Sequence, residues 1–468
     1  MSETPKNKLS ELLHSLTISE QKSFETYLNS PFFRCDKELL ILFNRLLSYP
    51  NSSKEAAFAH LFPGIPYNDK QLRYLISDLN RHIENFITIK ALDKKILLKK
   101  AIAAKSLSDR GCEKAYNHVH LEITTGNHFQ NSAFFRLQFE HAEEHLSHVA
   151  RIESRKNIPD YGSVMNHLDT FYILKKLQLS CEIANMANIL NRKIEIPLID
   201  EINKLATSSP YQNTPAISIY FNLLQTLTSN NPEDHFKEAE KLIKFNSGLF
   251  DPKELNELYQ YIKNYCVRKI NQGYTEYLKT LFGIYKDMLG NTKLTQHEYM
   301  SQYEFKNIVS ISLRLGEKKW CKEFLEKQLS LIPPQERINA SAYNTAYYYF
   351  MTDEFKKAIR KLQEVELNDV FYQLDARVIL LKSYYELDET EAFFYQVSSF
   401  RLFLLRNKGI SEFQKTIYRN LIKFLAAIMR AGISTTKLKA IRVEIEKERN
   451  VADPAYLMRK IAIALGEP

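Results

Sequence analysis

Glycine is scarce in this chain: only 12 of the 468 residues are glycine, well below the usual share of about 7%. Glycine supplies the positive backbone angles that tight hairpins and phosphate-binding loops need, so this chain can form few of them. Long helices joined by short polar turns suit such a composition. Hydrophobic residues make up 44% of the chain and charged residues 25%, which is typical of a folded globular protein.

Apolar residues recur with the period of an α-helix along most of the chain. The stretch NDKQLRYLISDLNRHIENFI, residues 68–87, places seven apolar side chains on one stripe behind a cap at Asn68 or Asp69. Strand-like alternation is missing. Helix-breaking segments recur at residues 208–215, 228–234, 249–254 and 331–336. The sequence therefore predicts an all-helical protein with tens of residues between breaks.

Small residues recur at the spacing of a helical repeat between residues 302 and 400. Cys321, Ala358 and Ala392 each follow a turn-like stretch and are separated by 37 and 34 residues, against 34 in a tetratricopeptide repeat. The unit FKNIVSISLRLGEKKWCKEFLEKQLSLIPP has a turn glycine at Gly316 and ends in Pro333. The next unit contains SAYNTAYYYFMTDEFKKAIRKL, with small and aromatic residues in matching places. This segment resembles the tetratricopeptide repeat (TPR) family.

The resemblance implies an all-α fold, a right-handed α-solenoid of antiparallel helix pairs with an atypical helical amino-terminal region. In such pairs a small side chain lets two helices approach closely. The sequence departs from the family at Val370, where a proline is usual. We expect four parts: a basic helical region (1–110), divergent helical repeats (111–250), TPR-like repeats (251–430) and capping helices (431–468).

In TPR proteins the first helix of each pair lines a concave groove that binds a peptide or a partner helix. The resemblance carries this groove onto Lys306, Arg314, Tyr343, Tyr347, Phe350, Arg377 and Tyr384. Aromatic area would anchor a peptide and arginine would bind its carboxylates. Aromatic residues at helical spacing are more often part of a packed core, and that alternative stays open. The favoured function is a non-enzymatic scaffold or adaptor that binds a protein or peptide partner.

The amino-terminal region supports a second interpretation, a nucleic-acid-binding regulator with helical sensor repeats. Residues 1–110 contain 17 Lys and Arg against 12 Asp and Glu, a net +5 of the chain's +9. Residues 53–86 resemble the second and third helices of a winged-helix domain, although no β-hairpin wing follows. The candidate contacts to nucleic acid are Lys70, Arg73, Arg81, Lys94 and Lys95. A solvated basic face on a cap of the solenoid is the alternative.

Residues 139–150, FEHAEEHLSHVA, contain H-x-x-E-H, the pattern of inverzincin metalloproteases. The candidate metal ligands are His141, Glu144, His145 and His148. Such enzymes need a further glutamate far downstream, and the segment at the matching distance, PAISIYFNL (215–223), has no acidic residue. We expect the buried stripe of this helix to be Phe135, Phe139, Ala142, Leu146 and Val149. The histidines would then lie on a solvated or groove-edge face, and the sequence predicts no metal site.

Other sequence signals of chemistry are missing. The chain has no nucleotide-binding loop and no hydrolase elbow, so we expect neither catalysis nor a cofactor. The five cysteines form no C-x-x-C pair, a pattern typical of free thiols in a reducing cytoplasm: Cys35, Cys112, Cys181, Cys266 and Cys321. No apolar leader begins the sequence, and no apolar run reaches the ~18 residues of a membrane helix. The prediction is a cytoplasmic protein that does not insert into a membrane.

Overall fold

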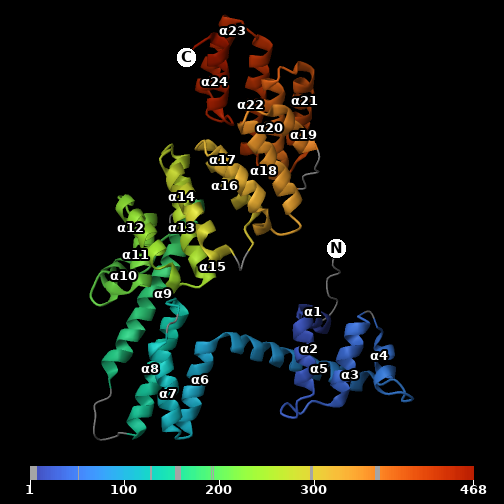
Figure 1. Ribbon diagram of the computed structural model, residues 1–468, viewed down its shortest axis with the longest axis vertical. Coiled ribbons are helices and arrows are strands. Elements are labelled where there is room, and N and C mark those ends of the chain that lie inside the picture. Colours follow the sequence, from blue (N-terminus) through green and yellow to red (C-terminus); the bar gives the residue numbers. More distant parts are fainter. Residues whose placement is uncertain are drawn as a thin grey trace. The chain divides into compact units, whose positions relative to one another are not determined.

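The computed structural model describes residues 8–50, 52–126, 129–152, 160–190, 192, 194–295, 299–363 and 369–467. Its α-helices, α1 to α24, follow one another with short connections (Figure 1). Most of them pack against the helices next to them, or next but one, in the sequence. This sequential packing is compatible with a helical repeat.

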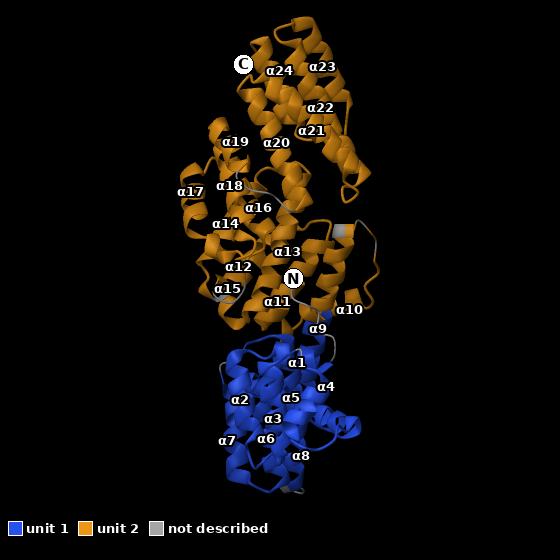
Figure 2. Ribbon diagram, turned by 90° about the vertical axis from the view of Figure 1, so that its right-hand side faces the viewer, with its two compact units in different colours: residues 1–176 blue, residues 177–468 orange. Residues whose placement is uncertain are grey.

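The chain divides into two compact units, which we call unit 1 (residues 1–176) and unit 2 (residues 177–468) (Figure 2). The boundary between them falls within helix α9 (Tyr161–Leu190). None of the three boundaries of the predicted four-part division coincides with it, and that division stays a prediction.

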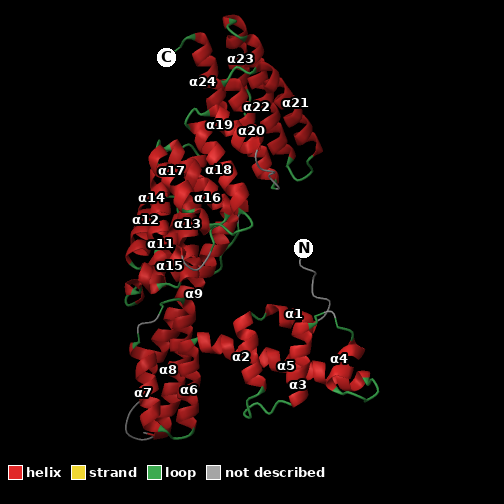
Figure 3. Cartoon of the chain, turned by 45° about the vertical axis from the view of Figure 1, so that its right-hand side comes forward, coloured by secondary structure: helices red, strands yellow, loops and turns green. Residues whose placement is uncertain are grey.

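No strand occurs in the described residues, whose regular secondary structure is helical throughout (Figure 3). The prediction of an all-α fold is thereby confirmed. The predicted breaks also fall between helices. Segment 208–215 lies at the boundary of α10 (Ile199–Ala206) and α11 (Pro215–Thr228), and segment 228–234 at that of α11 and α12 (Glu233–Phe245). Segment 249–254 includes the start of α13 (Pro252–Asn271), and segment 331–336 precedes α18 (Arg337–Met351).

The first five helices of unit 1 enclose one hydrophobic core. They are α1 (Lys8–Ser15), α2 (Ile18–Leu28), α3 (Lys37–Ser48), α4 (Lys54–Leu61) and α5 (Asp69–Lys94). Fully buried side chains at its centre include Phe24, Leu39, Leu42, Phe43, Leu79 and Ile83. The side chain of Asn68 accepts a hydrogen bond from the Gln71 backbone N–H at the start of α5, so the predicted cap of this long helix is confirmed.

Three further helices of unit 1 share a smaller core. They are α6 (Ile96–Asp109), α7 (Glu113–Thr125) and α8 (Ser132–Ile152). The first part of α9 completes unit 1. Helix α6 packs against both α7 and α8. The apolar core of these helices contains Ala104, Tyr116, Ile123 and Leu137.

Unit 2 contains the rest of α9 and the helices that follow it. The first group is α10 (Ile199–Ala206), α11 (Pro215–Thr228), α12 (Glu233–Phe245), α13 (Pro252–Asn271), α14 (Tyr277–Gly290) and α15 (Thr292–Thr295). The second group is α16 (Gln302–Arg314), α17 (Lys318–Lys327), α18 (Arg337–Met351), α19 (Phe355–Gln363), α20 (Val370–Glu386) and α21 (Thr390–Arg406). The last are α22 (Glu412–Ala431), α23 (Thr435–Lys447) and α24 (Pro454–Leu465).

The same turn recurs after α16, α18 and α20. Each of these helices is followed by a residue with positive φ: Gly316 (79°), Asp353 (63°) and Asp388 (55°). In each turn the next backbone N–H donates to a carbonyl five residues earlier, as in a Schellman cap. These bonds run from Glu317 to Ser312, from Glu354 to Tyr349 and from Glu389 to Tyr384. Three successive helix pairs thus repeat one local geometry at spacings of 37 and 35 residues.

Candidate functional site

Five aromatic rings form a layered group between α7 and α8, which we call the histidine stack: Tyr116, His120, His141, His145 and His148. The rings of Tyr116 and His148 lie 3.7 Å apart, centroid to centroid, and those of His120 and His145 lie 4.0 Å apart. Tyr116 and His145 are nearly parallel at 5.9 Å. The stack is therefore a packed element of unit 1.

Hydrogen bonds satisfy ring nitrogens along the histidine stack. They join Ser108 Oγ to His148 Nδ1 (2.7 Å), Tyr116 Oη to His145 Nδ1 (2.8 Å) and His120 Nδ1 to His141 Nε2 (3.0 Å). A neutral imidazole has one donor and one acceptor nitrogen, so a chain of such contacts can be buried without leaving a charge in the core.

The prediction that these histidines lie on a solvated face is wrong. His141 is 4% exposed and His148 6% exposed. The residues of the predicted stripe are half-buried: Phe135, Phe139, Ala142, Leu146 and Val149. The buried face of a helix is predicted from the spacing of its apolar residues, and histidine is not counted among these. Here stacking and hydrogen bonding make neutral histidines suitable core residues.

Burial keeps the histidine stack neutral at pH 7. Burial and then the neighbouring histidines lower the pKa of His141 and of His145 from 6.5 to about 4. Burial likewise lowers the pKa of His120 and that of His148. The imidazoles thus act as uncharged hydrogen-bonding rings at neutral pH.

The residues of the H-x-x-E-H pattern do not converge on one point. Glu144 pairs with Lys105 of α6, an ion pair exposed to solvent, while His148 bonds to Ser108. Across the part of the chain that the structure describes, no three histidine, cysteine or acidic side chains are arranged to hold a metal ion. The geometry of this motif is that of interhelix packing.

The candidate nucleic-acid contacts lie on the surface of α5 and at its carboxyl end. Lys70, Lys94 and Lys95 are exposed. Arg73 pairs with Asp69 at 2.6 Å, and Arg81 pairs with Asp78. Two of the five cations therefore have a carboxylate on their own helix, which weakens the field they would present to phosphates. Nucleic-acid binding through this surface stays a prediction.

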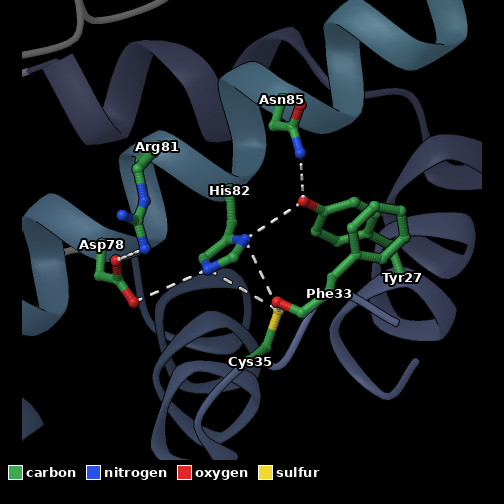
Figure 4. A network of polar contacts seen from close by, with 7 residues as sticks. All are labelled: Tyr27, Phe33, Cys35, Asp78, Arg81, His82 and Asn85. Carbon is green, nitrogen blue, oxygen red and sulfur yellow. Dashed lines mark hydrogen bonds and ion pairs between the residues drawn. The ribbon is translucent and has the colours of Figure 1, made fainter. Parts of the chain in front are cut away.

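A polar network in unit 1 joins residues that are far apart in the sequence and that form no recognisable motif (Figure 4). Tyr27 Oη lies 3.2 Å from His82 Nδ1 and accepts a hydrogen bond from Asn85 (2.8 Å). His82 Nε2 lies 3.7 Å from an Asp78 oxygen. Cys35 Sγ is close to the same ring. Cysteine, histidine and aspartate are the residue types of an activated thiol nucleophile, whose thiol must reach a ring nitrogen of the base.

The position of the Cys35 sulfur does not suit proton transfer. It lies 3.6 Å from His82 Nδ1 and 3.8 Å from Nε2. A hydrogen bond to one imidazole nitrogen lies in the ring plane and points away from the other nitrogen, so a sulfur nearly equidistant from both is aligned with neither. Burial and then Asp78 raise the pKa of Cys35, and burial lowers that of His82. This arrangement favours a neutral thiol beside a neutral ring.

This geometry predicts a slow thiol at Cys35. In the folded full-length protein, iodoacetamide at neutral pH should alkylate the exposed Cys112 at least about tenfold faster than Cys35, because the thiolate is the reactive form. Peptide mass spectrometry measures both rates, and unfolding in urea should bring them together. A Cys35 rate equal to or above that of Cys112 would instead identify an activated nucleophile.

The predicted groove residues of unit 2 divide into two groups. Lys306 of α16 pairs with Asp375 of α20 and lies 5.4 Å from the ring centre of Tyr343. Tyr343 is only 4% exposed and its ring is parallel to that of Tyr347 (6.4 Å, 4°). Lys306, Tyr343 and Tyr347 therefore meet in a packed interhelix cluster.

The other predicted groove residues lie apart from that cluster. Arg377 turns toward α21, where its guanidinium covers the ring of Phe403 (4.5 Å) and donates to Ser399 (3.1 Å). Phe350 packs edge-on against Phe355 of α19. Arg314 is exposed and Tyr384 is half-buried. Partner binding at these seven residues stays a prediction.

Two cavities are large enough to hold part of a ligand. One, of about 360 Å³, lies in unit 1 among α1, α3, α4 and α5 and is lined by leucines together with serines and other polar side chains. The other, of about 340 Å³, lies in unit 2 between α9 and α13 and is lined mostly by amide side chains. Reasoning from the sequence missed both, because their walls come from helices that are distant in the chain.

Comparisons with protein-family models, with curated proteins and with solved structures found no match to this chain. Among the described helices, none combines the length and the apolar character needed to cross a bilayer. Function therefore has to be argued from the geometry of the molecule itself.

Proposed function

We propose that this protein is a non-enzymatic interaction scaffold that binds a partner protein through unit 2. In this proposal unit 2 is a TPR-like, right-handed α-solenoid of antiparallel helix pairs, and unit 1 is an atypical helical region. The observation that carries the proposal is the turn repeated after α16, α18 and α20. Stacked helix pairs present an extended surface on which partners bind.

Packing between the repeated pairs adds support. Cys321 and Ala358 are fully buried, as expected where a small side chain lets two helices approach. Interhelix ion pairs join successive parts of unit 2, with Lys263 of α13 bonded to Glu304 of α16 and Lys382 of α20 bonded to Asp453 (2.5 Å) before α24. Such connections would keep the helix pairs in a fixed arrangement, which lowers the entropic cost of binding.

The proposed compartment is the cytoplasm. All five cysteines are free thiols in the structure, and three of them are buried. Free thiols suit a reducing environment. The proposed scaffold would therefore meet its partner among cytoplasmic proteins.

The test is affinity capture with the full-length protein from native lysate, with and without nuclease, followed by direct binding of the purified candidate. We expect a protein partner that nuclease does not remove and that binds the purified chain saturably. The proposal would be overturned if every captured species vanished with nuclease while a short DNA duplex bound with an affinity that falls steeply with salt. Replacing the exposed Lys94 and Lys95 by glutamine would then be the step that locates the contact.

A further inference from the structure

The 340 Å³ cavity of unit 2 has a distinctive lining, which we call the amide groove. Its polar walls are Asn185 and Asn188 of α9 and, around the end of α13, Asn264, Arg268, Asn271 and Gln272. Five of these six side chains carry a carboxamide. A carboxamide presents a hydrogen-bond donor and an acceptor side by side, as a peptide group does.

Much of this hydrogen-bonding capacity is unused inside the protein. Asn264 donates to Asn185 Oδ1 (3.2 Å), and Asn188 donates to the Leu227 carbonyl (3.1 Å). These two bonds fix the orientation of the amides and leave the Asn264 and Asn188 oxygens as acceptors and the Asn185 NH₂ as a donor. In the described residues, the side chains of Asn271 and Gln272 make no hydrogen bond, and both are exposed.

The polar side chains of the groove on α13 are spaced to contact successive residues of an extended peptide. Asn264, Arg268 and Asn271 follow at i, i+4 and i+7 and so lie along one face of the helix. Seven residues of helix rise about 10 Å, which is the length of about three residues of an extended chain. The two ends of such a segment would therefore meet Asn264 and Asn271.

The charge of the amide groove is positive. Arg268 contributes the one cation of the lining, and no carboxylate belongs to it. Its guanidinium lies over the ring of Tyr265 (5.4 Å), and the nearby Glu233 is paired with Lys269 instead. Val267 adds an exposed apolar edge. A carboxylate on the ligand would give Arg268 a charge-assisted partner.

We propose that the amide groove binds an extended peptide segment that carries an acidic side chain. The inference rests on the proposed scaffold function and names its site and the chemistry of its partner. The amides bond to the peptide backbone, Arg268 binds the carboxylate, and Val267 contacts the neighbouring side chain. Recognition of this kind depends on backbone N–H groups as well as on the acidic residue.

The test begins with a phage library of random dodecapeptides selected on the full-length protein. A selected peptide is then synthesised, labelled and titrated by fluorescence anisotropy. We expect the double variant Arg268→Gln/Asn271→Ala to weaken binding at least tenfold, since each lost polar contact is worth a factor of a few. Asn213→Ala removes an exposed asparagine outside the groove and should change the affinity less than twofold.

Two modified peptides refine the readout. N-methylation of the central backbone amides, or replacement of the acidic residue by its amide, should each reduce binding to the wild type. Thermal unfolding followed by circular dichroism checks that both protein variants stay folded. Selected peptides that bind the double variant as well as the wild type would overturn the amide groove and leave the scaffold proposal standing. Failure to recover any peptide, together with loss of all protein partners on nuclease treatment, would overturn both.

Discussion

Acidification from pH 7 to about pH 5 is expected to destabilise unit 1. The burial of His141 alone should lower the free energy of unfolding by about 2 kcal/mol over this range. The pKa of His141 is about 4 in the folded protein against 6.5 as its ordinary value. Between these values the unfolded chain binds more protons than the folded chain, so the free energy of unfolding falls as the pH falls. The contribution is complete above pH 6.5 and is lost toward pH 4. His145 adds a smaller amount because solvent screens it more.

The charges around the histidine stack do not reverse this direction. Burial is the largest influence on the pKa of His148 and lowers it; Arg151 lowers it further, and Glu113 opposes them as the smallest of the three. Glu144 is already paired with Lys105, and His167 of α9 lowers the pKa of His141 further. Protonation of the stack therefore puts positive charge into a buried site, where the charged form is disfavoured.

Unit 2 should respond to the same acidification with the opposite sign. Burial raises the pKa of Glu254 to about 7, where its carboxyl group contacts Gln178 (2.9 Å) and Tyr220 (3.0 Å). The folded state then binds the extra proton between pH 7 and its ordinary value of 4.5, so unit 2 gains stability as the pH falls through this range. The two units thus provide internal controls for each other.

Hydrogen exchange of the full-length protein at pH 7 and near pH 5, corrected for intrinsic rates, separates the two responses. Amides of α7 and α8 should lose protection on acidification. In His141→Leu this loss should shrink, whereas in His118→Ala, which changes an exposed histidine, it should persist. Equal protection of α7 and α8 at both pH values in the wild type would contradict the neutral, buried stack.

Replacing Glu304 by glutamine is expected to destabilise unit 2 by about 3–5 kcal/mol. Glu304 is the partner of Lys263, whose ammonium group is buried beside the ring of Tyr285. Burial lowers the pKa of Lys263 and Glu304 opposes that shift. Without the carboxylate the Lys263 ammonium is buried with no counter-charge. It must then either lose its proton or become exposed to water, which disrupts the contact between α13 and α16.

Urea denaturation of the full-length protein measures the effect. Glu323→Gln is the matched control, because Glu323 pairs with Lys327 on the surface, where an ion pair is worth less than about 1 kcal/mol. The double variant Lys263→Met/Glu304→Leu should recover most of the lost stability by replacing the pair with apolar contacts. If Glu304→Gln cost no more than Glu323→Gln, the pair would not be the buried connection described here.

The fold class could be predicted from the sequence because its signals are local. The period of the apolar residues predicted helix α5, and Asn68 was predicted as its cap. Proline-rich segments such as 331–336 predicted the breaks between helices. The turn residues Asp353 and Asp388 were harder to recognise. Each takes a positive φ that glycine adopts more readily. The repeated turn is therefore clearer in the backbone geometry than in the amino-acid sequence.

The candidate sites could not be predicted because they depend on which helices meet. The helical period does not show that His141 contacts His120 of another helix. The buried face of α8 was therefore assigned to its phenylalanines instead. Cys35 and His82 are 47 residues apart and share no motif. Asn185 and Asn264 are 79 residues apart, and their chemistry becomes a groove only when α9 lies beside α13.

The central claim is that unit 2 binds a protein segment in the amide groove. Its most direct test is hydrogen exchange of the full-length protein with and without a saturating selected peptide. We predict added protection at the carboxyl end of α13 and around Asn185 and Asn188, with unit 1 unchanged. Protection confined to unit 1, or to the surface of α5, would contradict the claim and move the binding site to the basic amino-terminal region.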